Sequence, residues 1–175
     1  TRGRSLISKR ILVWQEVQTK NAEWSHVRSY VGDGLCVEAL CPQGVRTTRI
    51  KEGLFDKPCE VWRIPIGPQE RLAFRDGLLL KAGNAYPWWT MPLFVSDAIT
   101  TAVMKRPVFW FTRHFRIFNI QVCSELDMYA NLKFTSYRLK DDRGREVPWR
   151  GCTPDYEHDL FNLSWNRAIQ VYEKK

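Results

Sequence analysis

The feature that most constrains this chain is the short loop Pro42-Gln43-Gly44, which lies between two runs that favour strands. The runs cover residues 35–41 and 45–50, and both are rich in apolar or β-branched residues. A Pro/Gly loop of this length turns the chain back on itself and so joins neighbouring antiparallel strands. The sequence therefore predicts a β-hairpin over residues 35–50.

Further strands are predicted from apolar runs and from the turn residues between them. Asp76-Gly77 separates residues 72–74 from residues 78–80, and an Asp-Gly pair in this setting is a strong hairpin signal. A strand at 61–66 contains Pro65, which cannot donate to a ladder and so marks a sheet edge or an early end. The other predicted strands cover residues 11–17, 108–122 and 132–139, and a turn follows at 141–144.

Two helices are predicted. Ser96 is a suitable N-cap for a short helix over residues 97–104. Thr153 as a cap and Pro154 at the first helical position begin a second helix near the C-terminus. An apolar face of that helix would pack across the sheet and would consist of Phe161, Trp165, Ala168 or Ile169, and Tyr172.

These elements predict the fold class α+β, with a mostly antiparallel sheet built from hairpins and with the C-terminal helix and the shorter helix packed on it. The chain has 175 residues, enough for one good core, and no linker divides it. We expect a single globular domain over residues 11–175, preceded by a basic N-terminal arm at residues 1–10.

The charge and the cysteines restrict the partner and the compartment. A net charge of +8 favours a polyanionic partner such as nucleic acid or an anionic membrane surface. The odd number of cysteines, without a close CxxC pair, predicts reduced thiols in the cytoplasm or nucleus, and neither a metal site nor a cofactor is expected. The five cysteines are Cys36, Cys41, Cys59, Cys123 and Cys152.

Motifs for catalysis are absent from the sequence. It contains no phosphate-binding loop, no dinucleotide fingerprint and no hydrolase or zinc-enzyme signature. Cys152 and His158 could form a dyad, but both lie at one predicted helix start, where their side chains would not meet. The pair Asp141-Asp142 is typical of a turn. We therefore expect a non-enzymatic protein without a small-molecule substrate.

Basic and aromatic residues alternate in the second half of the chain, a mixture that suits phosphates and bases of single-stranded nucleic acid. The alternative is that these charges are an ordinary solvated face. The N-terminal arm adds further cations, which commonly contact phosphates or lipid headgroups. The predicted binding residues are Arg2, Arg4, Lys9, Arg10, Lys105, Arg106, Trp110, Arg113, Arg116, Arg138, Lys140, Arg143 and Arg145.

A second candidate surface is the loop at residues 86–92, whose two prolines exclude regular structure. Its Trp88 and Trp89 either plug one end of the core or form a protein-interaction site, since exposed tryptophans often dominate interfaces. The leading hypothesis is a basic domain that contacts RNA or single-stranded nucleic acid through phosphates and aromatic stacking. A protein partner or self-association would use the tryptophan loop.

Residues 107–175 contain the run Arg113-His114-Phe115-Arg116-Ile117-Phe118-Asn119-Ile120, followed by a predicted strand, an acidic turn, a Trp, and a predicted helix that ends at residues 171–175. In this order of features, they resemble the C-terminal part of rhabdovirus matrix proteins. The rest of the chain does not match. The resemblance implies, as the alternative function, a viral matrix-like or accessory structural protein that binds anionic membrane, nucleocapsid and itself.

Overall fold

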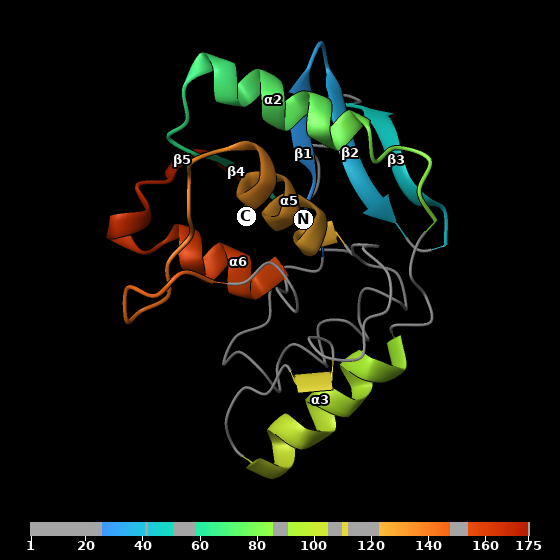
Figure 1. The fold of residues 1–175 in the computed structure, drawn as a ribbon, viewed down its shortest axis with the longest axis vertical. Helices are drawn as coiled ribbons and strands as arrows, with labels where there is room; N and C mark the ends of the chain where they lie inside the picture. Colours follow the sequence, from blue (N-terminus) through green and yellow to red (C-terminus); the bar gives the residue numbers. More distant parts are fainter. Residues whose placement is uncertain are drawn as a thin grey trace.

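The computed structural model describes residues 26–40, 42–50, 59–85, 91–104, 110–111, 123–147 and 154–174. It contains a three-stranded and a two-stranded antiparallel sheet together with helices, which confirms the α+β class (Figure 1). The strands are β1 (Ser29–Gly32), β2 (Leu35–Leu40), β3 (Gly44–Arg49), β4 (Cys59–Arg63) and β5 (Ile169–Lys174). The helices are α2 (Pro68–Leu79), α3 (Met91–Met104), α5 (Cys123–Phe134) and α6 (Pro154–Phe161), with a 3₁₀ turn at Ser164–Asn166.

The hairpin predicted over residues 35–50 is confirmed as β2 and β3, which pair antiparallel from Leu35–Arg49 to Leu40–Gly44. β1 pairs with the other edge of β2, so β2 is the central strand. The β1–β2 turn includes Asp33 with φ 51°, a left-handed conformation that Asp tolerates better than most residues. The sequence thus places β2 between two partners, where its side chains are the most enclosed.

Helices α2 and α5 cover one face of this sheet (Figure 1). The main core lies between these two helices and the sheet. It contains Val37 of β2, Leu78 of α2, and Leu126 and Ala130 of α5, all of which are buried. Leu126 and Ala130 are four residues apart and therefore share one face of α5. This packing fixes the start of α5 relative to the central strand.

A second layer joins β4 to the C-terminus. β4 pairs antiparallel with β5, and β4 stops at Arg63, before Pro65, which confirms the predicted early end of this strand. A smaller core of Met128, Leu139 and Leu160 links α5, the following loop and α6. The turn predicted at 141–144 is also confirmed, because the Asp141 carboxylate accepts the backbone N–H groups of Arg143 and Arg145.

The hairpin predicted at Asp76-Gly77 is wrong, since these residues lie inside α2. Pro68 occupies the first turn, where its missing N–H costs no hydrogen bond, and the Glu70 carboxylate accepts the Gly67 N–H at 3.1 Å. Gly77 does not turn the chain; it lets α2 approach Phe134 of α5. Helix packing therefore overrides the turn signal.

The C-terminal helix was predicted to continue to residue 172, and this is wrong beyond Phe161. The Asn166 amide donates to the Leu160 carbonyl at 2.6 Å, and it exchanges hydrogen bonds with the backbone of Lys140. Arg167 then takes a left-handed φ of 53°. The chain reverses there, and its last residues complete a sheet with β4.

Two further predictions need correction. The predicted strand at 132–139 is wrong, because residues 132–134 are the last residues of α5 and the rest is loop.

The helix predicted to start after Ser96 begins at Met91, since Pro92 is tolerated in a first turn. Ser96 therefore lies inside the helix, where its hydroxyl donates to the Pro92 carbonyl at 2.9 Å. In 108–122 only Trp110 and Phe111 are described, and their backbone is helical. The predicted strand at 11–17 lies outside the described residues.

Replacing Gly77 by alanine is expected to destabilise the fold. A Cβ at this position would overlap the Phe134 ring of α5, so the ring or the helices would have to shift. Overpacking of this kind costs about 1–3 kcal/mol, which exceeds the roughly 1 kcal/mol that Gly→Ala gains in a helix. Urea unfolding should show a lower midpoint for Gly77→Ala, whereas Gln69→Ala on the exposed first turn of α2 should change it little.

Candidate active site

Glu38 is a buried carboxylate on the central strand, and its side chain is 0% exposed. Across the ladder it faces Arg46 of β3. Arg46 donates to Oε1 of Glu38 from both Nε and Nη2, at 3.0 and 2.9 Å. A charge without access to water must be neutralised by its neighbours, so these two hydrogen bonds help to stabilise the buried carboxylate of Glu38.

His26 and Arg28 approach the other carboxylate oxygen from the segment that leads into β1. His26 Nε2 lies 2.9 Å from Oε2 of Glu38, and Arg28 Nε lies 2.7 Å from the same atom. The Arg28 Nε–H does not point at the oxygen well enough to count as a hydrogen bond, so this contact is an ion pair. Three nitrogen-bearing side chains therefore converge on one carboxylate.

These surroundings hold Glu38 in its ionised form. Burial raises the pKa of its carboxyl, but the His26 hydrogen bond, the charges of Arg28 and His26 and the Arg46 hydrogen bond outweigh burial and leave the pKa at about 2. Burial lowers the pKa of His26, but its side-chain hydrogen bonds with Cys123 and Glu38 bring it above the ordinary 6.5. The imidazole is thus poised to accept a proton.

Cys123 is the first residue of α5, and its thiol is the second hydrogen-bond partner of His26. Cys123 is partly exposed, whereas Cys36 and Cys59 are buried. The first amides of a helix lack intrahelical acceptors, and the positive end of its dipole favours a thiolate.

A hydrogen bond between β1 and α5 holds the imidazole and the thiol in register. The buried Ser29 hydroxyl donates to Oδ1 of Asp127, and the Asn131 amide donates to Oδ2 of the same carboxylate at 3.1 Å. Ser29 follows His26 by three residues, and Asp127 lies about one helical turn after Cys123. The Ser29–Asp127 contact therefore ties together the two segments that carry the reactive groups.

Glu157 of α6 is a further buried carboxyl near this network and is 1% exposed. Burial raises its pKa well above the ordinary value, and the neighbouring charges of Asp127 and Cys123 act in the same direction. Its oxygens lie beside Asp127 but make no hydrogen bond of good geometry. Burial and these neighbouring charges therefore favour the protonated form of Glu157.

A second histidine cluster links β4 to α6. His158 Nε2 lies 2.9 Å from Oε2 of Glu60, which also accepts the Trp62 indole N–H at 2.9 Å. The Trp62 ring stacks on Phe161 with 5.7 Å between centroids. Because these contacts join the two-stranded sheet to the helix, His158 has a clear structural role. Cys152, considered as its dyad partner, lies outside the described residues.

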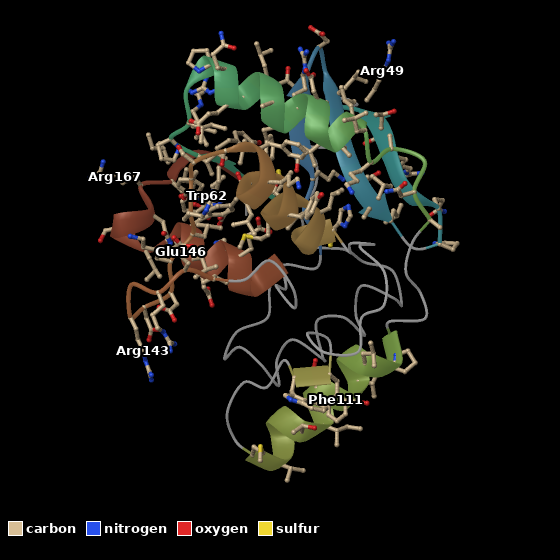
Figure 2. The ribbon with its side chains drawn as sticks, viewed as in Figure 1. Arg49, Trp62, Phe111, Arg143, Glu146 and Arg167 are labelled. Carbon is tan, nitrogen blue, oxygen red and sulfur yellow. The ribbon has the colours of Figure 1, made fainter. Side chains whose placement is uncertain are left out.

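Five of the predicted binding residues are described, and they do not form one aromatic and basic surface. Arg138 donates to the backbone carbonyls of Thr135 and Tyr137, and Arg145 pairs with Asp141 at 2.8 Å. Figure 2 shows Arg143 projecting from the molecule far from Phe111, the neighbour of Trp110. The described members of the set are Trp110, Arg138, Lys140, Arg143 and Arg145.

The other predicted binding residues lie outside the described part of the chain, and so do Trp88 and Trp89. The last two residues of the predicted loop, 91 and 92, are described and belong to α3, so the prediction of no regular structure over 86–92 is wrong there. The undescribed basic residues are Arg2, Arg4, Lys9, Arg10, Lys105, Arg106, Arg113 and Arg116. Within the described residues, no three His, Cys, Asp or Glu side chains are placed to hold a metal ion. In the same part of the chain, no helix has the length and apolar character needed to cross a membrane.

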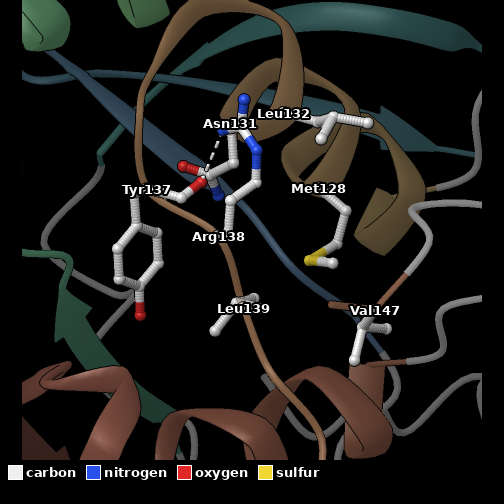
Figure 3. A pocket seen from close by; sticks show the side chains of 7 residues that line it. All are labelled: Met128, Asn131, Leu132, Tyr137, Arg138, Leu139 and Val147. Atoms are coloured by element: carbon white, nitrogen blue, oxygen red, sulfur yellow. Dashed lines mark hydrogen bonds between the residues drawn. The ribbon is translucent and has the colours of Figure 1, made fainter. Parts of the chain in front are cut away.

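The pocket in Figure 3 is a small cavity between α5 and the loop that follows it. It has room for about one water-sized molecule. It is lined by Met128, Asn131, Leu132, Tyr137, Arg138, Leu139 and Val147. Its size excludes a substrate, so it is a packing feature of the smaller core.

Sequence reasoning missed the Cys123–His26–Glu38 arrangement. One signal was available: Gly32-Asp33-Gly34 lies between His26 and Glu38 and turns β1 back onto β2, which brings the segment before β1 near Glu38. The position of Cys123 gave no such signal, because the helix that it begins was partly interpreted as a strand. In chemical terms, a thiol, an imidazole and a carboxylate in hydrogen-bonded sequence can activate sulfur as a nucleophile.

No protein-family model, no curated protein and no solved structure matches this chain. The resemblance to rhabdovirus matrix proteins therefore gains no support from known proteins. One part of it is wrong, since residues 171–174 belong to strand β5 and not to a helix. Its basic and aromatic run at 113–120 lies outside the described residues.

Proposed function

We propose that this protein is a cysteine-dependent acyl-transfer enzyme in which Cys123 is the nucleophile. His26 acts as general base and then as general acid, and Glu38 orients the imidazole. The observation that carries the proposal is the hydrogen-bonded series from Cys123 through His26 to the ionised Glu38. The substrate class is a carbonyl compound with a leaving group, namely an ester, a thioester or an amide.

The reaction balances within these three side chains. His26 takes the thiol proton, and the Cys123 sulfur bonds to the carbonyl carbon to give a tetrahedral oxyanion. The oxyanion collapses to a thioester while His26 returns the proton to the departing alcohol, thiol or amine. Water or another nucleophile then gives a proton to His26, attacks the thioester carbonyl and releases the acyl group. The sulfur recovers its proton in the last step.

The remaining parts of the site suit this chemistry. The ionised Glu38 favours one orientation of the ring and stabilises the imidazolium that forms after proton transfer. The backbone N–H groups in the first turn of α5 are the proposed oxyanion donors, because the attacked carbonyl must lie next to the Cys123 sulfur. Cys123 is partly exposed, so a substrate can reach it.

The proposal is tested by selective alkylation of the cysteines. Iodoacetamide should modify Cys123 at pH 6, well before the buried Cys36 and Cys59, because the partner histidine takes up the thiol proton. Mass spectrometry of the peptides gives the rate at each site. An activated ester such as p-nitrophenyl acetate should then leave one acetyl group on Cys123. Alkylation of Cys123 only in alkaline solution, with no acylation, would contradict the proposal.

The expectation of a non-enzymatic protein rested on the absence of catalytic motifs from the sequence, and the proposal above replaces it. Nucleic-acid binding was expected from the net charge of +8 and from the mixture of basic and aromatic residues. It remains a separate prediction, and the salt dependence of RNA retention would test it. The two proposals do not exclude each other, because the basic residues named for binding differ from the three that would carry the chemistry.

A further inference from the structure

Helix α3 carries an apolar stripe that the described protein leaves exposed. Val95, Ile99 and Val103 are 54%, 61% and 76% exposed, and we call these three residues the α3 stripe. They recur every four residues, so they lie on one side of the helix. Met104, at the end of the helix, is 52% exposed as well. Aliphatic side chains gathered on one helix face in this way mark a binding surface.

Every described polar side chain on α3 is satisfied within the protein. The only charged residue of the helix, Asp97, is 0% exposed and accepts the backbone N–H of Phe111 at 2.8 Å. The hydroxyls of Ser96 and Thr100 donate to backbone carbonyls one turn earlier, at 2.9 and 2.8 Å. The helix thus turns its one acid inward and presents a face that is uncharged.

An aromatic residue adjoins this helix. Phe111 lies beside α3 (Figure 2), held by the Asp97 contact, and its neighbour Trp110 is 48% exposed. The two rings meet edge to face with 5.1 Å between centroids. Tryptophan is enriched where protein meets the boundary between lipid headgroups and acyl chains, because its ring is apolar and its N–H is polar.

The charge of the chain identifies the partner that this surface suits. The net charge is +8, and Lys105 and Arg106 follow Met104 directly in the sequence. Two copies of the chain would repel each other, and the stripe holds no acid that could offset this repulsion. An anionic bilayer suits both the exposed α3 stripe and the positive charge of the chain, because its acyl chains cover aliphatic side chains and its headgroups attract cations.

We propose that α3 docks on an anionic lipid bilayer, lying in the plane of the headgroups with Val95, Ile99 and Val103 facing the acyl chains. The helix has 14 residues, fewer than the roughly 20 needed to span the hydrocarbon core, so it lies on the surface. This inference does not depend on the chemistry at Cys123.

The test is flotation of the full chain with vesicles of phosphatidylcholine, with or without phosphatidylserine. The wild type should float only with the vesicles that contain phosphatidylserine. Ile99→Glu with Val103→Glu should reduce the bound fraction about tenfold or more, because it removes apolar contact and adds repulsion. Leu80→Glu is the matched control, since Leu80 is 80% exposed at the end of α2 and lies outside the stripe.

A second variant separates apolar burial from charge. Ile99→Lys with Val103→Lys adds cations, so it should also lose binding if the stripe is buried in lipid. Binding that survives this change would overturn the proposal, because it would mean that charge alone suffices. Loss of self-association in sedimentation, with lipid binding unchanged, would overturn it as well. Circular dichroism and Cys123 alkylation should be the same in all variants, which shows that they fold.

Discussion

His26→Gln is expected to slow acylation of Cys123 by about 10³-fold, within the range attributed to a positioned general base. Glutamine retains polarity and approximate size but cannot accept the thiol proton. The rate of p-nitrophenol release, measured in a single turnover with excess enzyme, gives the effect on the chemical step directly. Alkylation of Cys123 by iodoacetamide should at the same time become slow at pH 6 and recover only in alkaline solution.

His158→Gln is the control for this experiment. His158 is also hydrogen-bonded to a glutamate at 2.9 Å, but it lies in the contacts between β4 and α6. Its replacement should leave the alkylation profile of Cys123 unchanged even if it lowers the unfolding midpoint. If both histidine variants slow acylation equally, the loss reflects stability and the assignment of His26 as the base fails.

Glu38→Gln is expected to destabilise the fold by about 2–4 kcal/mol near pH 7. The substitution keeps the volume of the side chain but leaves the groups around it without their negative partner, and breaking a buried ion pair costs about 3–5 kcal/mol. The expected value is lower because Arg28 and Arg46 are 27% and 42% exposed and can reach water. Urea unfolding measures the change in free energy.

The pH dependence of stability tests the same carboxylate. The folded pKa of Glu38 is about 2, below its ordinary 4.5, so its stabilisation is present above pH 4.5 and is lost as pH falls toward 2. This difference corresponds to about 3 kcal/mol. Glu157 acts in the opposite sense above pH 4.5, because its folded pKa is raised. The wild type and Glu38→Gln should therefore be compared across the acid range, where their stabilities should converge.

The exposed pair Arg75–Asp76 provides the matched comparison. Its two side chains are 43% and 60% exposed and lie 2.9 Å apart. Asp76→Asn should cost less than about 1 kcal/mol, as is usual for surface ion pairs. An equally small effect for Glu38→Gln would mean that the buried cluster does not stabilise the sheet.

Local signals predicted the parts of the fold in which neighbours along the chain decide the geometry. The loop at residues 42–44 sets the β2–β3 hairpin, Pro65 ends β4, and Pro154 starts α6. Each of these depends on backbone restrictions of a few adjacent residues. The turn at 141–144 was likewise predicted from its own residues.

The predictions that failed concern segments whose conformation depends on distant contacts. Asp76-Gly77 is a good turn sequence in isolation, but Gly77 packs against Phe134 in a helix. The helical pattern beyond Phe161 gives way to a strand because β4, about 100 residues away, offers hydrogen-bond partners. A propensity of a few tenths of a kcal/mol per residue does not outweigh such burial and pairing.

The sequence by itself determined the β2–β3 hairpin, because a Pro/Gly loop turns the chain back within a few residues. Only the tertiary structure decided that His26, Glu38 and Cys123 would meet. That contact requires α5 to pack Leu126 and Ala130 onto β2, and the Ser29–Asp127 hydrogen bond to hold the helix start in place. Such contacts between residues nearly 100 positions apart depend on burial and shape, which leave no local pattern in the sequence.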